Sequence, residues 1–435
     1  MTDGAAMRAA TSLHIAWLGP APSEDGGVGG VGADLLHGLA ALGHRIDCFF
    51  PSSGQPVPER LRENANVTFN WGTSQWKWDR WYSRTKITSF ASGMVARSLA
   101  SVRLRRQVAE RHQRDPFDVI YQFSSIESPA VPARLARTVP LVIHPETHSA
   151  GELRSLLAER RLALRCQPLP RFAAVVSIML LRSLVQRRHI RRARLLVCIS
   201  SVFRDHMVRD YGFPAENTVV VPNPVRLARF APTEGSIGDP PRVLVLGRIA
   251  ARKGIDDVVA VAKTLLERGT HVRIRIVGGP SLWSDYTRLL EDLPAENAEY
   301  VGSVPAAEIP GELGASDVLL QASRYEPFAL TVAEALAAGV PVVGTTEVGA
   351  IERVDRSVAA AGAPRDVAAM ADSIVAMLER VRAGHAETAA LARAEAEQLF
   401  APEVVCAQIS RALGGLVQAP ARRSDAPPPA AAPVT

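Results

Sequence analysis

Short apolar runs rich in valine and isoleucine alternate along this chain with longer, helix-length segments. Their interiors are continuously apolar, which is typical of parallel sheets covered by helices on both faces. The runs form two series, at 14–19, 45–50, 118–123, 140–144 and 195–200, and at 242–247, 272–278, 299–304, 318–323 and 340–345. We therefore predict an α/β fold of two doubly wound, Rossmann-like domains.

A segment rich in proline and glycine, at 226–241, separates the two series and lacks periodicity. It predicts an N-terminal domain over 1–225, a linker over 226–241 and a C-terminal domain over 242–415. The Pro/Ala-rich tail at 416–435 is expected to be disordered.

Composition fits two globular domains, since 47% of the 435 residues are hydrophobic and 22% are charged. The cysteines are scattered without C-x-x-C spacing, which favours reduced thiols over a disulfide framework or zinc ligands (Cys48, Cys166, Cys198, Cys406). The first residues have no apolar core of a signal peptide, so we expect a cytoplasmic protein.

The formal net charge of +6 is concentrated in the first half. Residues 80–114 hold nine Arg or Lys and one acid, and residues 171–194 hold seven Arg and no acid. Such a surface suits nucleic acid, anionic lipid or a phosphorylated small molecule. The apolar run at 172–181 has ten residues, and a bilayer span needs about twenty, so we expect no membrane crossing.

A glycine-rich stretch, EDGGVGGVGADLL at 24–36, follows the first apolar run. Gly27, Gly29 and Gly32 spell G-x-G-x-x-G, and Asp47 stands where a ribose-binding acid of a dinucleotide fold would lie. In that motif the first glycine ends the strand, whereas here GPAPSED intervenes. The alternative to a dinucleotide-binding oxidoreductase is a backbone that must approach another ligand closely.

Two cations follow the strand at 242–247, in the octet GRIAARKG. Arg248 and Lys253 would stand at the carboxyl edge of a sheet, where α/β folds bind ligands. A guanidinium and an ammonium there suit a diphosphate, although a solvated basic loop has the same composition.

Two acids, Glu326 and Glu334, flank the predicted start of a helix near Leu330. Free N–H groups of Ala329, Leu330 and Thr331 would favour an anion there. Carboxylates beside an anion site suit sugar hydroxyls, and together these groups fit a nucleotide-sugar. Taken alone, Glu334 could instead compensate the helix dipole.

The segments GRIAARKG and EPFALTVAEALAAGVPVV resemble the retaining GT-B glycosyltransferases of family 4, glycosyl transferases group 1. The similarity extends to GGVG with Gly43-His44, to PLVIH and to VCISSVFRDHMVRDYGFPAENTVVVPNPV, and covers residues 13 to about 415. The chain departs from the family pattern at Ala329, usually glycine, and at Pro224, usually glycine.

The resemblance implies that Arg248 and Lys253 bind the donor diphosphate and stabilise the leaving nucleoside diphosphate. Glu326 and His144 would contact the transferred sugar, with His148 as the rival histidine, and Glu334 would bind the ribose. Further donor contacts are implied at Gly27, Val28, Val301, Ser303, Phe328, Leu330 and Thr331.

No cofactor or metal is implied, because the nucleoside-diphosphate sugar is a substrate and Pro145 disfavours a helical metal site in HPETH. The implied mechanism is substitution on one face of the sugar, in which the departing phosphate takes the acceptor proton. A GT-B epimerase or hydrolase and a non-catalytic nucleotide-sugar-binding protein stay open as alternatives.

The acceptor is expected to be a glycan, a lipid-linked glycan or a small molecule, as in polysaccharide biosynthesis. Four of the six tryptophans lie with cations in 71–86, and 172–194 joins an apolar run to an arginine cluster. Aromatic rings beside cations suit sugar stacking and the membrane interface. These segments predict contact with the cytoplasmic face of an anionic membrane, while a packed lid and a buried helix are the structural alternatives.

Overall fold

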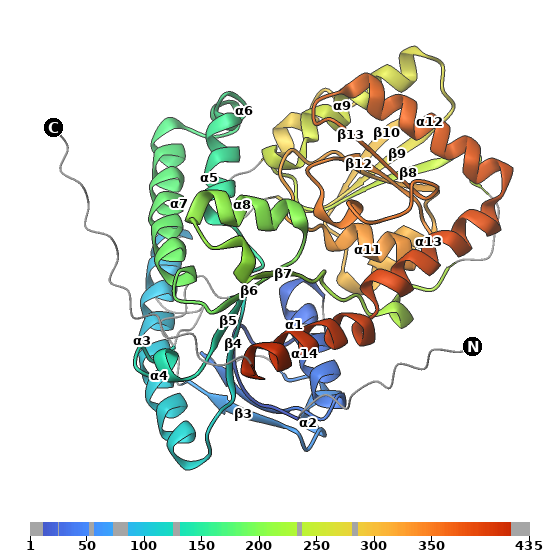
Figure 1. The fold of residues 1–435 in the computed structure, drawn as a ribbon. Helices are drawn as coiled ribbons and strands as arrows, with labels where there is room; N and C mark the ends of the chain where they lie inside the picture. The colour runs from blue at the N-terminus through green and yellow to red at the C-terminus, as the bar shows by residue number, and fades with distance from the viewer. Residues whose placement is uncertain are drawn as a thin grey trace, which may run out of the picture.

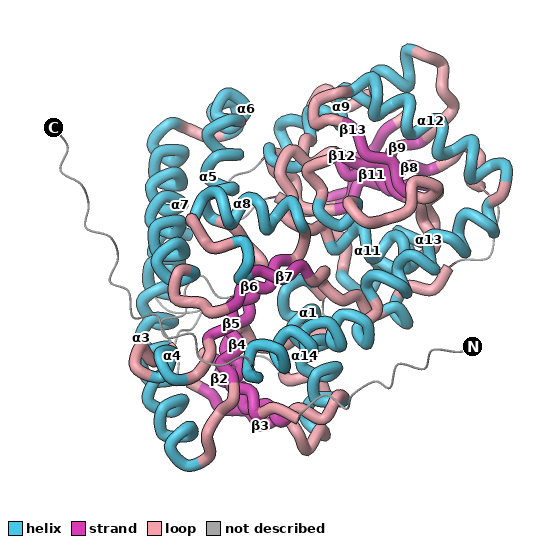
Figure 2. Tube along the Cα trace, viewed as in Figure 1, coloured by secondary structure: helices cyan, strands magenta, loops and turns pink. Residues whose placement is uncertain are grey.

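The computed structural model describes residues 12–24, 26–51, 56–72, 86–124, 131–232, 237–280 and 286–418. Two α/β bodies lie side by side, each with a parallel sheet between helices (Figure 1; Figure 2). The predicted fold class is therefore confirmed. The tryptophan-rich segment 71–86 lies largely outside the described residues.

The first sheet has seven parallel strands in the order β3-β2-β1-β4-β5-β6-β7. These are β1 (His14–Leu18), β2 (Arg45–Phe50), β3 (Val67–Trp71), β4 (Val119–Phe123), β5 (Leu141–His144), β6 (Leu195–Cys198) and β7 (Thr218–Val220). The helices between them are α1 (Gly27–Ala41), α2 (Glu59–Arg62), α3 (Lys86–Arg114), α4 (Leu135–Thr138), α5 (Ser149–Ala158), α6 (Arg160–Cys166), α7 (Leu169–Ile190) and α8 (Ser201–Tyr211).

The second sheet has six parallel strands in the order β10-β9-β8-β11-β12-β13. These are β8 (Arg242–Leu246), β9 (Arg273–Val277), β10 (Ala298–Gly302), β11 (Val318–Gln321), β12 (Val342–Thr345) and β13 (Ala359–Gly362). Its helices are α9 (Ile255–Glu267), α10 (Ile309–Gly314), α11 (Leu330–Ala337), α12 (Val367–Ala383) and α13 (His385–Phe400), and the short 3-10 turn η4 (Ala251–Lys253) precedes α9.

The apolar runs predicted ten of these strands, and the other three, β3, β7 and β13, are edge strands. An edge strand has one neighbour and is partly solvated, so it needs no continuous apolar run. Accordingly, β3 reads VTFNW, β7 has three residues and β13 reads AAAG.

The last helix, α14 (Pro402–Gln418), crosses back to the first domain and packs against α1 (Figure 1). Val405, Cys406, Ile409 and Leu413 are buried in the core of the first sheet. The predicted second domain runs to residue 415, whereas residues from 402 onward pack into the first core. A boundary drawn along the sequence could not reveal this return.

A second departure concerns α7, which is longer and more apolar than the ten-residue run at 172–181 indicated. An 18-residue window of this helix has mean hydropathy 1.4, and 22% of the window is buried. By length and composition alone it could cross a membrane. In this fold α7 packs against α5, with Phe172, Val175 and Met179 buried.

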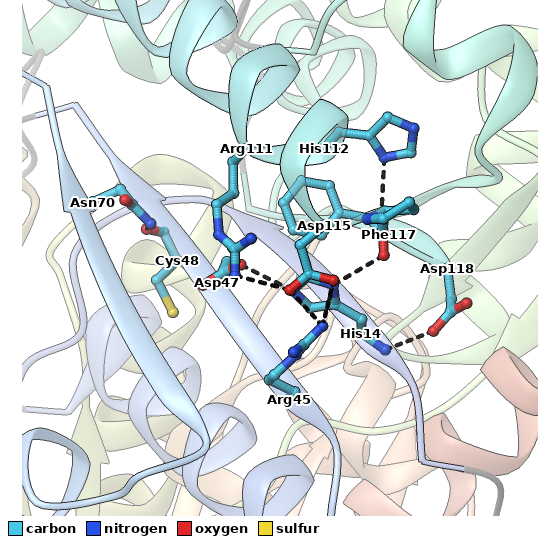
Figure 3. Close-up of polar contacts among 11 residues, drawn as sticks. His14, Arg45, Asp47, Cys48, Asn70, Arg111, His112, Asp115, Phe117 and Asp118 are labelled. Carbon is cyan, nitrogen blue, oxygen red and sulfur yellow. Dashed lines mark hydrogen bonds and ion pairs between the residues drawn. The ribbon is translucent and has the colours of Figure 1, made fainter.

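A network of charged side chains lies toward the amino ends of β1 and β2 (Figure 3). His14 Nε2 lies 2.8 Å from Asp47 Oδ2, and Arg111 Nε of α3 lies 3.0 Å from the same oxygen. Arg45 and Arg111 both pair with Asp115. Asp47 is 1% exposed and fully engaged, so it cannot be the ribose-binding acid of the dinucleotide alternative.

Candidate active site

The carboxyl ends of the two sheets meet at the junction between the domains. His148 follows β5, and its Nδ1 lies 2.7 Å from the hydroxyl of Tyr325, which follows β11. Ser200 follows β6 and donates to the carbonyl of Pro327 at 2.7 Å. These two contacts form an interdomain seam at the carboxyl edges, where α/β sheets usually bind ligands.

A cluster of cations surrounds Glu326 on the second domain. Its Oε2 accepts a hydrogen bond from Arg252 Nη1 at 3.0 Å and forms an ion pair with Lys253 Nζ. Both cations belong to η4, which the left-handed Gly254 ends. A side chain at residue 254 would collide with the Ala322 carbonyl, so glycine lets η4 lie against the end of β11.

The ionisation of this cluster follows from burial and pairing. Burial raises the pKa of Glu326, but Lys253 and Arg252 outweigh burial, so its pKa lies below the usual value. Burial lowers the pKa of Lys253, and Glu326 offsets only part of that effect. The pair therefore places a carboxylate beside fixed positive charge in a partly desolvated setting.

Arg248 is exposed and lies near enough to Lys253 to lower the pKa of that ammonium. No described residue pairs with its guanidinium, which leaves its donors available to a ligand. Ser303 Oγ lies against Gly279, and Gly278 donates to the carbonyl of Gly302 at 2.8 Å. The structure thus brings Val301 and Ser303 to the same edge of the sheet as Arg248.

The start of α11 supplies the anion-binding end of a helix. Leu330 and Thr331 lie in its first turn, and Val332 N already donates to Ala329 O at 3.0 Å. The Leu330 and Thr331 amides have no acceptor within the helix at this end. Ala329 has φ 76°, a left-handed conformation that explains why glycine is usual there.

Phe328 and Glu334 have different surroundings at this helix. The Phe328 ring is 3% exposed and packs edge-on against Phe400, so only its backbone can face a ligand. Burial raises the pKa of Glu334 to about 7, an effect that Arg229 reduces. No described side chain donates a hydrogen bond to Glu334, so its carboxyl can accept from a hydroxyl.

The glycine-rich stretch begins a helix. Gly26 and Gly27 have φ of 81° and 59°, and α1 starts at Gly27. Gly27 and the half-buried Val28 lie in the first turn, and a side chain at Gly27 would meet open space. Gly29 packs on Ser23, and Gly32 packs on the Phe123 ring. The glycines therefore serve a left-handed turn and close packing.

The two histidines of HPETH have separate surroundings. His144 ends β5, is fully buried, and its Nδ1 lies 2.7 Å from the Tyr121 hydroxyl. Its Nε2 has no hydrogen-bond partner among the described residues and lies 3.4 Å from Glu146 Oε1. Burial lowers the pKa of His144 to about 3, so the ring is neutral.

His148 instead faces the second domain and contributes to the seam. Its Nε2 lies 3.0 Å from Asp210 Oδ2, and its ring lies edge-on to Phe203 and Tyr211. Because both ring nitrogens face protein groups, His148 is engaged in the seam, whereas His144 keeps a ring nitrogen without a hydrogen-bond partner among the described residues.

Sequence reasoning missed three residues of this region. Arg252 stood within GRIAARKG between the two chosen cations, and only the turn geometry shows that it grips Glu326. Glu146, which accepts from Asn223 Nδ2 at 2.7 Å, lies in HPETH, where the sequence suggests only a metal site. Tyr325 precedes Glu326 and gave no signal, because its partner His148 is 177 residues away.

Two Rossmann-like domains whose carboxyl edges meet around a cationic, helix-capped site define the GT-B class. The profile of "Glycosyltransferase Family 4" matches residues 25–229, and that of "Glycosyl transferases group 1" matches residues 240–380. The chain therefore belongs to the GT-B glycosyltransferases of family 4.

Individual relatives agree with this family. Glycogen synthase of Mycobacterium tuberculosis is 26% identical over 391 residues, which cover 84% of this chain and 86% of that protein. Mannosylfructose-phosphate synthase of Agrobacterium fabrum is 28% identical over 177 residues, covering 37% of this chain and 39% of that protein. The match thus spans well under half the length of that relative.

The fold likeness extends to solved structures. The crystal structure of HepE from Anabaena in complex with UDP has a TM-score of 0.61 and 18% identity, and covers 93% of this chain and all of that chain. At this identity the likeness concerns the fold.

Proposed function

We propose that this protein transfers a sugar from a nucleoside-diphosphate sugar to an acceptor, with retention of the anomeric configuration. The observation that carries the proposal is the cationic cluster of Arg248, Arg252 and Lys253 beside Glu326, at the same sheet edge as the start of α11. Such an arrangement suits a diphosphate that gains charge as it leaves. HepE of Anabaena, which shares this fold, has been solved in complex with UDP, and this supports a nucleotide ligand for the fold.

In the proposed reaction the bond between the anomeric carbon and the diphosphate oxygen breaks. Arg248, Lys253 and the Leu330 and Thr331 amides stabilise the charge that develops on the leaving diphosphate. The acceptor hydroxyl attacks from the same face, and its proton passes to the departing phosphate oxygen. Retention follows because the new bond forms on the face that the leaving group vacates.

The carboxylates and His144 orient the donor. Glu334 accepts from the ribose hydroxyls, and its burial, which raises its pKa to about 7, supports this role. Glu326 and His144 contact the transferred sugar from the two domains. The Glu326 carboxylate and the His144 ring are both shielded from solvent. Their hydrogen bonds to the sugar hydroxyls would therefore be strong.

For the acceptor we propose a sugar carried at an anionic membrane surface. The outer face of α7 exposes Leu180, Leu181, Leu184 and Val185, each 47–58% exposed, and Arg187 and Arg188 follow directly. An apolar stripe bordered by arginines suits the interface of an anionic bilayer. The protein would then work on the cytoplasmic face of the membrane.

Donor binding is tested with a panel of UDP-, GDP-, ADP- and dTDP-sugars in a thermal-shift assay, because a bound donor stabilises the native state. One base should raise the melting temperature, and its sugar should be transferred with the donor's anomeric configuration, as NMR of the product reports. A donor that is consumed equally fast without acceptor would instead indicate a hydrolase. No stabilisation by any donor would contradict the proposal.

Membrane contact is tested by sedimentation with phosphatidylglycerol vesicles at low and high salt. The wild type should sediment at low salt, and Leu181→Ser with Leu184→Ser should reduce the bound fraction severalfold. Leu391→Ser on α13, also exposed at 43%, is the matched control and should bind like the wild type. If the wild-type protein stays in the supernatant at low salt, membrane contact is contradicted, and the basic surface would instead bind a soluble acidic acceptor.

A further inference from the structure

The linker after the first domain begins with a short 3-10 turn, η3 (Leu227–Arg229), that lies against the second domain. Arg393 of α13 holds this turn, because its Nη1 donates to the carbonyl of Phe230, the next residue, at 2.5 Å. The same nitrogen donates to the carbonyl of Ala337, the last residue of α11, at 2.7 Å. Arg393 therefore ties η3 to the helix that carries Glu334, one turn before Ala337.

Arg229 extends from η3 to two segments that the sequence assigns to the donor site. Its Nη2 donates to the carbonyl of Ala306 at 2.5 Å, in the loop that follows β10 and Ser303. Its Nη1 lies beside the glycine-rich turn, 3.4 Å from the position that a Cβ of Gly26 would take. Arg229 is half-buried, so a ligand in this region can reach it.

Arg229 also acts on Glu334. Burial raises the pKa of Glu334 to about 7, and the positive charge of Arg229 opposes this rise. In the part of the chain that the structure describes, no second charged group contributes to this pKa. The ionisation of Glu334 at neutral pH therefore depends on one cation, which comes from the linker.

The other charged groups on elements that pack against α11 have partners elsewhere. Arg393 of α13 pairs with Glu397. Glu352 follows η7 (Gly349–Ile351) and accepts from the Ser201 amide at 2.7 Å. The strands β11 and β12, which also contact α11, read VLLQ and VVGT and carry no charge. These surroundings leave Arg229 as the group that can adjust Glu334.

The ionised form of Glu334 is the form that suits a ribose. A carboxylate has only acceptor sites and can take hydrogen bonds from two neighbouring hydroxyls, whereas the acid form carries a proton on one of its oxygens. Hydrogen bonds to an ionised acceptor are also about twice as strong as those between neutral groups. A positive charge nearby favours the ionised form.

We propose that Arg229 is a positioning residue for the nucleoside of the donor, which keeps Glu334 in its carboxylate form and links α11 to the loop after β10. The inference rests on the proposed role of Glu334 toward the ribose. Arg226, three residues earlier, cannot take this role, because it pairs with Glu24 and Asp34. A segment that the sequence identifies only as a linker thus contributes to nucleotide recognition.

The inference is tested by the preference for a ribonucleotide over its 2′-deoxy counterpart, since the two ligands differ by one hydroxyl. Calorimetry measures the ratio of the two affinities for the nucleoside diphosphate that binds the wild type. At pH 8 the wild type should prefer the ribonucleotide about tenfold or more. The ratio should fall as pH drops through 7, because Glu334 becomes protonated.

Arg229→Gln should raise the pH at which the ratio changes, because it removes the charge that favours ionised Glu334. Its ratio at pH 7 should be at least about threefold lower than that of the wild type. Arg229→Lys keeps the charge and should retain most of the ratio. Arg382→Gln, exposed on α12, is the matched control and should behave like the wild type. Glu334→Gln should show a low ratio that does not change with pH.

Equal losses of affinity for both nucleotides in Arg229→Gln would overturn the inference, because Arg229 would then contact another part of the ligand. A wild-type ratio at every pH would overturn it too. If the wild type binds no nucleoside diphosphate, the proposed function fails, and melting temperatures decide the inference alone. The pH at which Glu334→Gln begins to gain stability over its parent should then be higher in the Arg229→Gln background, and the same pH in both backgrounds would overturn the inference.

Discussion

Single residues at this site carry unusual backbone and ionisation states, and Ala329 is the plainest case. It begins α11 with φ 76° and ψ 85°, where a Cβ crowds its own backbone. Ala329→Gly should raise the free energy of unfolding by about 1 kcal/mol, since relief of this strain exceeds the entropy that glycine adds to the unfolded chain. Calorimetric melting checks it, and an unchanged or lower melting temperature would show that Ala329 is not strained.

Glu334 predicts a particular dependence of stability on pH. Burial raises its folded-state pKa to about 7, above the ordinary 4.5 of the unfolded chain. Its stabilising effect is therefore complete below pH 4.5 and is lost as pH rises through 7, by an amount on the order of 3 kcal/mol. The melting temperature of Glu334→Gln minus that of the wild type should increase from pH 5 to pH 8.

The exposed Glu267→Gln serves as the control for this experiment, because its side chain faces solvent. A constant difference for Glu334→Gln as well would mean that Glu334 ionises normally in the folded protein.

The sequence predicted part of this residue-scale picture. Arg248, Lys253, Glu326 and the start of α11 follow strands directly, so local order along the chain places them at one edge. Arg252 could not be chosen over its neighbours, because the direction of a side chain in η4 depends on the left-handed turn at Gly254. The contrast between His144 and His148 needed the opposite domain.

At the scale of elements, every central strand was predictable, but of the four edge strands only β10 was. Central strands are buried on both faces and must be apolar throughout, whereas β3, β7 and β13 each have one neighbour. The sequence also could not predict which domain α14 packs against, because the pattern of an amphipathic helix does not specify which sheet the helix covers.

The packing of α14 against the first sheet can be tested by substitution. Ile409 is fully buried in the core of the first sheet, so Ile409→Ala should destabilise that domain by about 2–5 kcal/mol. Arg411→Ala, exposed on the same helix, should change stability by less than about 0.5 kcal/mol. Equal melting temperatures for the two variants would mean that α14 does not complete the first core.

At the scale of the whole molecule, the two domains share apolar and polar contacts that neither sequence half reveals. One continuous apolar cluster includes Ile199 and Phe203 of the first domain with Phe328 and Ile351 of the second. The repeated strand pattern predicts the two-domain organisation. The contacts of the seam could not be predicted, because they depend on how the carboxyl edges of the two sheets face each other.

The account's central claim is that the cations at this seam bind a nucleoside diphosphate. It is tested most directly by calorimetric titration of UDP, GDP, ADP and dTDP into the wild type, Lys253→Ala and Lys263→Ala. Lys263 is exposed on α9 and serves as the charge-matched control. One nucleotide should bind the wild type and the control equally and Lys253→Ala at least about tenfold more weakly, a difference of about 1.4 kcal/mol. Equal binding by all three proteins, or no binding by the wild type, would contradict the account.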